Sequence, residues 1–318
     1  MTEKQRFIAA LERKPITGRV PHFELVFYLT MESIGKVHPD HRHFNQWNQM
    51  SETEKELLRN DQADCYIDIA EKYGHSAIFV GAPNNTMDEQ IKFYNLVQEK
   101  TNGKLFVMIY GDPTIAIPNG EDMLEFSAMC ADEPEKVKKK AQAAVDSHIR
   151  EAEQIAKHPG LVDGFAMCSD YCFNTNPFFS PSMFSEFVAP YLAQIIKAYR
   201  DLGFYTIKHT DGNIMPILDQ MVQCNPHALH SIDPQAGVDL AQVKRLVGDK
   251  VCLIGNVNCG LLQTGLEEEV VADVRRALQQ GMPGYGYIFS TSNCIYTGMP
   301  LARYELMNKI WREEGIYK

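Results

Sequence analysis

The chain has 318 residues, of which 45% are hydrophobic and 23% charged, the ordinary balance of a globular protein that buries a large core. Its formal net charge of -10 argues against a nucleic-acid partner, because no basic patch is dense enough to neutralise several phosphates. No apolar stretch approaches the roughly 20 residues of a membrane span, and the charged N-terminus lacks a signal-peptide core. The eight cysteines are irregularly spaced, so we expect reduced thiols and a cytoplasmic location.

Short apolar runs alternate with longer helical patterns along the chain, as in repeated βαβ units. The sequence predicts strands at residues 20–27, 76–80, 105–110, 162–168, 204–209, 228–232, 251–254 and 287–290. These are eight strands, the number that closes a parallel barrel. We therefore expect an α/β fold, a (β/α)8 TIM barrel that forms a single domain over residues 1–318. A doubly wound open sheet is the alternative.

The helices between these strands carry recognisable start signals. Capping boxes are predicted at Thr2 with Gln5, at Ser51 with Glu54 and at Thr264 with Glu267. Ser180, which precedes a proline, is expected to cap a long helix whose apolar residues recur at spacings of three and four up to Tyr199. Another helix is predicted over residues 132–157.

Polar side chains gather where the predicted strands end. In a parallel barrel the functional groups lie at the carboxyl ends of the strands. The residues found there are Glu24, Tyr110, Asp112, Asp170, His209, Asp211, Asp233, Asn256, Asn258 and Cys294. This clustering favours an enzyme over a scaffold.

His209 and Asp211 are two residues apart, so their side chains are expected on the same side of the strand end. An imidazole and a carboxylate so placed can share a metal ion or form an acid–base pair. In the alternative, Asp211 caps the next helix and His209 is a hydrogen-bonded core residue. Cys294, in the loop after the last strand, would complete a three-ligand zinc site with an open fourth position. Its alternative role is that of a small apolar loop residue.

Aromatic residues near the strand ends favour an apolar or aromatic substrate, although each could equally serve packing. We expect substrate contacts from Glu24, Phe27, Tyr110, Tyr171 and Phe178.

Several segments carry the pattern of a known family. They are Arg6 to Glu12, Arg19-Val20-Pro21, Phe178-Phe179-Ser180-Pro181, His209-Thr210-Asp211-Gly212-Asn213, Ile254 to Asn258 and Ser292-Asn293-Cys294. Together they resemble the uroporphyrinogen decarboxylase superfamily, particularly its cobalamin-dependent methyltransferase branch. The resemblance implies a (β/α)8 barrel, in agreement with the strand count. The true decarboxylases carry an arginine-rich motif that grips the porphyrinogen carboxylates. Residues 21–27 here are acidic and arginine-free, which disfavours a uroporphyrinogen-type decarboxylase.

The methyltransferase branch implies a zinc ion held by a His-x-Cys pair and a later cysteine. In this sequence Asp211 stands at the first cysteine position, and either Cys294 or Asn293 stands at the second. Oxygen and nitrogen ligands leave zinc a harder Lewis acid, suited to an ether or amine substrate. We expect a methyltransferase, an O-demethylase-like enzyme that moves a methyl group from a small methylated substrate, such as a methoxylated aromatic, to the cobalt of a separate corrinoid protein. His209, Asp211 and Cys294 would hold the zinc, with Glu24 as a fourth group.

Further roles follow from the same resemblance. Asp170 and Asp233 would orient ligand imidazoles or accept protons, and Asn256, Asn258 and Asp233 would contact the cofactor. The sequence has no Asp-x-His-x-x-Gly motif of its own for cobalamin, so the cobalamin is expected on a partner. Three alternatives stay open: methyl transfer from methylcobalamin to a thiol or to tetrahydrofolate, a decarboxylase, and a non-catalytic module that binds a corrinoid or tetrapyrrole. A homodimer is a possible assembly.

Overall fold

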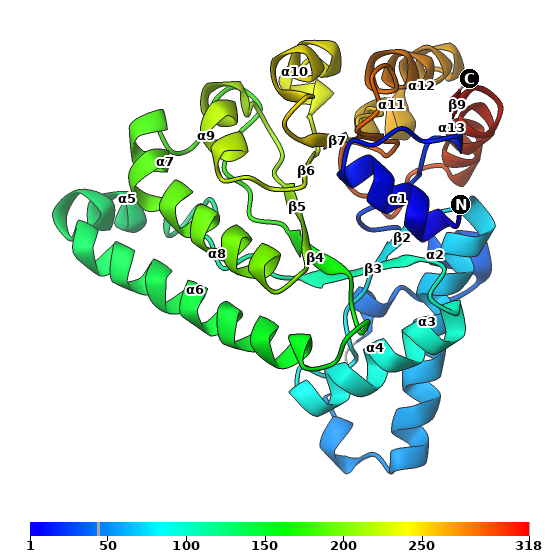
Figure 1. Cartoon of the computed structure of the whole chain (residues 1–318), viewed down its shortest axis with the longest axis horizontal. Helices are drawn as coiled ribbons and strands as arrows, with labels where there is room; N and C mark the ends of the chain where they lie inside the picture. Colours follow the sequence, from blue (N-terminus) through cyan, green and yellow to red (C-terminus); the bar gives the residue numbers. More distant parts are fainter. Residues whose placement is uncertain (43–44, 318) are drawn as a thin grey trace.

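A parallel sheet of seven strands forms the centre of the computed structural model, which describes residues 1–42 and 45–317. The strands are β2 (Ala77–Phe79), β3 (Phe106–Tyr110), β4 (Gly164–Met167), β5 (Tyr205–His209), β6 (Ala228–His230), β7 (Cys252–Ile254) and β8 (Tyr287–Ile288). They are hydrogen-bonded in chain order, and each lies inside a predicted strand. The sheet curls, and helices cover its outer side (Figure 1). The predicted α/β class is therefore confirmed.

The first predicted strand, residues 20–27, does not form as a continuous strand. Only β1 (Gly18–Arg19) is regular here, and it pairs antiparallel with β9 (Ile316–Tyr317). The chain after it is extended and lies between the two edges of the curled sheet. The amide of Phe289 donates to the carbonyl of Pro21 at 2.9 Å, and the amide of Ser76 donates to the carbonyl of His22 at 2.7 Å. Pro21 has no amide hydrogen to donate, and the segment contacts the sheet through isolated bridges at His22 and Phe27.

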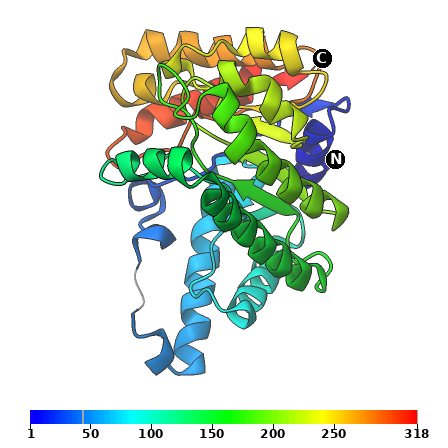
Figure 2. The ribbon, with the colours of Figure 1, turned by 90° about the vertical axis from the view of Figure 1, so that its left-hand side faces the viewer.

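Thirteen α-helices surround or cap the sheet within the part of the chain that the structure describes. They are α1 (Glu3–Leu11), α2 (Thr30–Ile34), α3 (Glu52–Tyr73), α4 (Met87–Thr101), α5 (Met123–Asp132), α6 (Pro134–Ala156), α7 (Pro181–Phe187), α8 (Ala189–Asp201), α9 (Leu218–Gln223), α10 (Leu240–Val247), α11 (Cys259–Thr264), α12 (Glu267–Gly281) and α13 (Leu301–Glu314). The first half of α3 and residues 45–51 before it extend beyond the rest of the molecule in both views (Figure 1, Figure 2). None of the described helices combines the length and the apolar character needed to cross a bilayer.

Most of the predicted helix starts are confirmed. The capping boxes of α1 and α3 form, and the Ser180 hydroxyl accepts the amide of Met183 at the start of α7. The box predicted at Thr264 is wrong, because Thr264 ends α11. The Glu269 carboxylate accepts the amide of Leu266 at the start of α12 instead. The long helix predicted up to Tyr199 is broken into α7 and α8. Pro190 has no amide hydrogen, so it cannot donate the backbone hydrogen bond that would continue the first helix.

The inside of the curled sheet is filled by apolar side chains that α1 closes from one end. Phe7 of α1 packs against Phe106 and Phe23, with ring centroids 4.8 Å and 5.9 Å away. Ile207 and Ile288 belong to the same buried cluster. The helix therefore closes the amino end of the strands and leaves their carboxyl ends, where the polar residues were predicted, as the open end.

Candidate functional site

Three ligand-type side chains converge at the carboxyl end of β5. Asp170, His209 and Asp211 offer one nitrogen and two oxygen atoms that all lie within 4.8 Å of one another. Among the described residues, these three side chains form a group that could hold a metal ion. His209 Nε2 lies 3.7 Å from Asp211 Oδ1 and 3.8 Å from Asp170 Oδ1. These separations are too long for hydrogen bonds, and Asp211 Oδ1 is buried without a partner. The three groups therefore leave a polar gap that suits a shared cation.

Gly212 makes the turn that places Asp211 beside His209. It adopts a φ of 83°, and a Cβ added to it would lie 2.6 Å from the carbonyl oxygens of Cys172 and Phe173. Only glycine fits this close approach without strain. The amide of Asp211 then donates to Asp170 Oδ1 at 2.9 Å, which ties the loops after β4 and β5 together.

A chain of two imidazoles determines which nitrogen of His209 faces the carboxylates. His230 Nε2 lies 3.0 Å from the carbonyl oxygen of Thr291, so it must carry the hydrogen. Burial lowers the pKa of His230 and of His209 to about 3, so both rings are neutral. His230 Nδ1 is then an acceptor, and His209 Nδ1 donates to it across 2.8 Å. His209 Nε2 keeps its lone pair, as a metal-binding imidazole requires.

Asp211 sits in an environment that disfavours its negative charge. Burial, followed by the charges of Asp170 and Asp233, raises its pKa to about 7. The side chain of Asn293 donates to Asp211 Oδ2. The Asp211 side chain therefore does not serve as a helix cap. A cation in the gap would relieve the repulsion among the carboxylates of Asp211, Asp170 and Asp233.

Cys294 is not part of this cluster, although Asn293 next to it is. The amide of Cys294 donates to Asn293 Oδ1 at 2.6 Å, and burial raises the pKa of its thiol above the ordinary value. Of the three predicted metal ligands, the structure thus brings together His209 and Asp211, and it adds Asp170 where Cys294 was expected.

Glu24 forms the second feature of the site. Its carboxyl group is fully buried, with Oε1 at 3.0 Å from His22 Nε2 and Oε2 at 3.2 Å from the amide of Thr291. Burial raises its pKa to about 8, so Glu24 holds a proton at neutral pH. Thr291 connects the two features, because its carbonyl accepts the hydrogen bond from His230.

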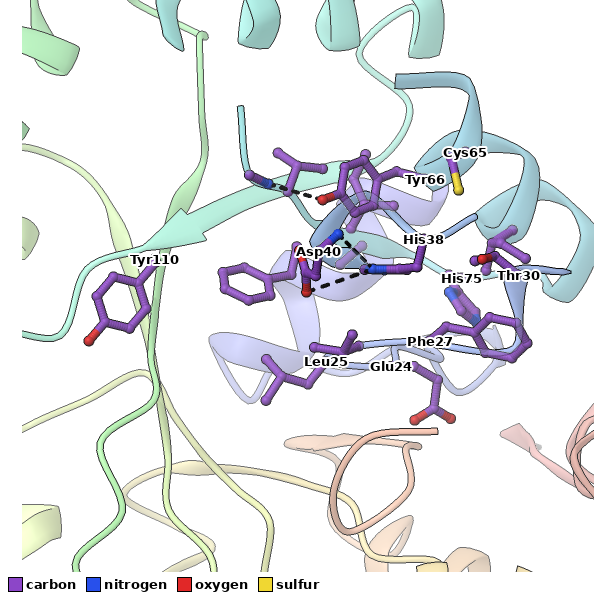
Figure 3. A pocket seen from close by; sticks show the side chains of 17 residues that line it. Glu24, Leu25, Phe27, Thr30, His38, Asp40, Cys65, Tyr66, His75 and Tyr110 are labelled. Atoms are coloured by element: carbon purple, nitrogen blue, oxygen red, sulfur yellow. Dashed lines mark hydrogen bonds and ion pairs between the residues drawn. The ribbon is translucent and has the colours of Figure 1, made fainter. Parts of the chain in front are cut away.

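A cavity of about 300 Å³ opens beside Glu24 (Figure 3). Glu24, Phe27 and Tyr110, three of the residues predicted to contact a substrate, line it. The other two predicted contacts lie elsewhere. Tyr171 is buried with its hydroxyl 2.5 Å from the Thr114 hydroxyl, and Phe178 packs among other phenylalanine rings.

The residues predicted to contact a cofactor use their polar atoms within the protein. Asn256 is fully buried, and its amide group donates to Ile232 at 2.7 Å and accepts from Arg276 at 3.0 Å. Asn258 caps α11, and Asp233 accepts the amide of Gly212 at 3.2 Å. These contacts shape the loops around the site, and direct cofactor contact remains a prediction.

A buried ion pair behind the cluster was missed from the sequence. Lys208 Nζ lies 2.7 Å from Asp112 Oδ2 and 2.7 Å from the carbonyl oxygen of Ser169, and both charged side chains are inaccessible to solvent. The pair joins the ends of β3, β4 and β5. A lysine directly after the apolar Ile207 in a predicted core strand was the available sequence signal.

Comparison with known proteins adds a family match. A family model described as uroporphyrinogen decarboxylase (URO-D) matches residues 114–313. The structure of a methyltransferase from Methanosarcina mazei aligns over 99% of both chains, with a TM-score of 0.73 and 18% identity, which shows a shared fold. A GH5_18 protein from Bifidobacterium longum subsp. infantis aligns over 95% of this chain and 80% of its own, at 12% identity, but its TM-score of 0.49 supports no argument. No curated protein matches the chain.

Proposed function

The chain belongs to the uroporphyrinogen decarboxylase family, and from this premise we propose that it transfers a methyl group from a small methylated substrate to the cobalt of a corrinoid carried by a separate protein. The observation that carries the proposal is the His209 lone pair, which faces two carboxylates at the open end of the sheet. We also propose that residues 20–27 take the place of the eighth strand of a (β/α)8 barrel, since their backbone forms hydrogen bonds with both edges of the sheet.

Zinc fits the donor set that the chain presents. His209 Nε2, Asp211 and Asp170 would hold it, and the unpartnered Asp211 Oδ1 supports this assignment. When bound, zinc would withdraw electrons from the heteroatom that carries the methyl group and make that heteroatom a better leaving group. One nitrogen and two oxygen donors suit this Lewis-acid role better than they suit activation of a soft thiolate.

The remaining chemistry falls to the side chains of the protein. The cavity would hold the substrate and exclude water from it. The electron pair of the broken methyl–heteroatom bond would stay on the heteroatom, and the Co(I) of the partner's corrinoid would accept the methyl group by supplying the electron pair of the new bond. The heteroatom then needs a proton, which Glu24 can supply because it is protonated at neutral pH and lines the cavity.

Decarboxylation of a porphyrinogen has little support from the cavity. Two carboxyl groups, those of Glu24 and Asp40, line it, and neither lysine nor arginine is found among its described lining residues. An octa-acid substrate would require several cations there.

The test combines metal analysis with a methyl-transfer assay. We expect stoichiometric zinc in the metal-replete protein, loss of zinc in His209→Ala, and retention in the control His158→Ala, which alters an exposed histidine. Incubation with cob(I)alamin and a panel of methoxyarenes, methylamines and methyl thioethers should give methylcobalamin, followed by absorbance. If the metal-replete wild-type protein contains no stoichiometric zinc, the zinc part of the proposal is refuted. Transfer only from methylcobalamin to a thiol or to tetrahydrofolate would reverse its direction.

A further inference from the structure

We propose that the cavity beside Glu24 selects methyl donors by charge: it binds an uncharged donor with an apolar body and rejects donors that carry a carboxylate or sulfonate. This inference rests on the proposed methyl transfer, because it names the class of substrate for that reaction. The cavity lies where residues 24–27 face residues 77–81, and α3 contributes Cys65, Tyr66 and Ile69 to its wall (Figure 3). The backbone hydrogen bond from Ser76 to His22 joins the two sides at one end.

The ionisable groups of the cavity offer no positive charge to an anion. Its lining contains the acids Glu24 and Asp40, and the imidazoles of His38 and His75. Burial lowers the pKa of His38 to about 4 and that of His75 well below the ordinary value, so both imidazoles are uncharged. Because no lysine or arginine occurs among the described lining residues, a bound anion would lose its hydration without gaining a cation.

A cationic donor is also poorly matched. The Glu24 carboxyl group is buried and already bonded to Thr291 and His22, and burial raises its pKa to about 8, which disfavours a negative charge at pH 7. The Asp40 side chain is 49% exposed. A cation inside the cavity would therefore lack a buried counter-charge. Most of the remaining wall is apolar: Leu25, Val26, Phe27, Ile69, Ile78, Phe79 and Val80.

Two hydroxyl groups could orient an uncharged donor. Thr30 is 2% exposed and lines the cavity, yet its Oγ1 has no hydrogen-bond partner, and the neighbouring Cys65 thiol is only a weak donor. The Tyr66 hydroxyl accepts the amide of Gly81 at 3.4 Å, which leaves its own hydrogen free to donate. An ether or hydroxyl oxygen could accept from either group, whereas a hydrocarbon would leave both unused.

Glu24 lines the cavity and is linked to the three-residue cluster through the loop after β8, which itself lies outside the cavity lining. Glu24 contacts Thr291 in this loop, and the carbonyl of Thr291 accepts from the His230 ring that holds His209. Asn293, two residues further along, donates to Asp211. The Glu24 side chain therefore lies between the cavity and the loop that contacts the proposed metal ligand Asp211.

Binding to the metal-replete protein without cob(I)alamin tests this inference apart from the reaction. Calorimetry at pH 7 would compare 4-methoxyphenol, 4-methoxybenzoate and 4-methoxy-N,N,N-trimethylanilinium, which share a ring and a methoxy group. We expect 4-methoxyphenol to bind at least about tenfold more tightly than either charged probe, since a buried charge without a partner is costly. Equal or tighter binding of 4-methoxybenzoate would overturn the inference.

A lysine added to the wall should change the preference. Val26 is half-buried and lines the cavity, so Val26→Lys is expected to tighten 4-methoxybenzoate binding at least about fivefold. Val37→Lys is the matched control, because Val37 is 45% exposed and outside the lining; it should leave both affinities unchanged. If Val26→Lys does not fold, the wild-type preference still decides.

The two proposals fail in different ways. Methyl transfer with no preference for the uncharged probe would refute charge selection and leave the methyltransferase standing. Preferred binding of the uncharged probe, with no methyl transfer from any donor, would refute the methyltransferase and leave charge selection standing.

Discussion

Replacement of Glu24 by glutamine tests whether this buried carboxyl group holds a proton. Burial raises its pKa from 4.5 to about 8, so the folded chain binds the proton more tightly than the unfolded chain does. The stability that this proton contributes is complete below about pH 4.5 and is lost as the pH rises through about 8. At about 1.4 kcal/mol per pKa unit, the difference corresponds to as much as about 5 kcal/mol.

Glutamine has nearly the same shape, can donate to His22 and accept from Thr291, and cannot ionise. Urea unfolding at pH 5, 7 and 9 would give the free energy of unfolding of wild type, Glu24→Gln and the control Glu268→Gln, which alters an exposed residue of α12. From pH 5 to 9, wild type and control should lose more stability than Glu24→Gln, by up to about 4 kcal/mol. Parallel curves for wild type and Glu24→Gln would refute the proton assignment, and with it the role of Glu24 as the acid.

Three further substitutions probe the supports of the site. His230→Phe removes the acceptor that fixes the metal-binding imidazole and should lower zinc affinity about 10–100-fold, measured by chelator competition; unchanged affinity would refute the tautomer argument. Lys208→Met leaves the Asp112 charge buried and unpaired and should cost about 3–5 kcal/mol in urea unfolding, while the exposed Lys197→Met should cost little. Gly212→Ala forces a Cβ to within 2.6 Å of two carbonyl oxygens and should lower both stability and zinc content; full retention of both would contradict the proposed turn.

The strands were predictable because each is a local run of apolar residues, and seven of the eight predicted runs contain an observed strand of the sheet. The exception is residues 20–27, where the pattern of hydrophobicity is that of a strand but Pro21 lacks an amide donor. Whether such a segment forms a ladder or single bridges depends on what lies beside it. The break between α7 and α8 had a local cause in Pro190, yet the apolar spacing continued across it and concealed the break.

The cluster was partly predictable for a geometric reason. Strand ends converge at one end of a curled parallel sheet, so Asp170, His209 and Asp211 could be expected close together. The one-residue choice between Asn293 and Cys294 could not be made, because it depends on how the loop after β8 turns. The register of β5 and β6 sets His209 opposite His230, and only the paired strands reveal that the two rings bond to each other.

The loop after β8 couples the two chemical tasks that the proposed reaction requires. The amide of Thr291 donates to Glu24, which would supply the proton, and its carbonyl fixes His230, which determines the nitrogen that His209 presents. The position of one peptide segment therefore influences both the acid and the proposed metal ligand. Since Asn293 in the same segment contacts Asp211, the loop also determines how far the carboxylate stands from the imidazole. Substitutions in the loop after β8 should therefore alter the protonation of Glu24 and the affinity for zinc together.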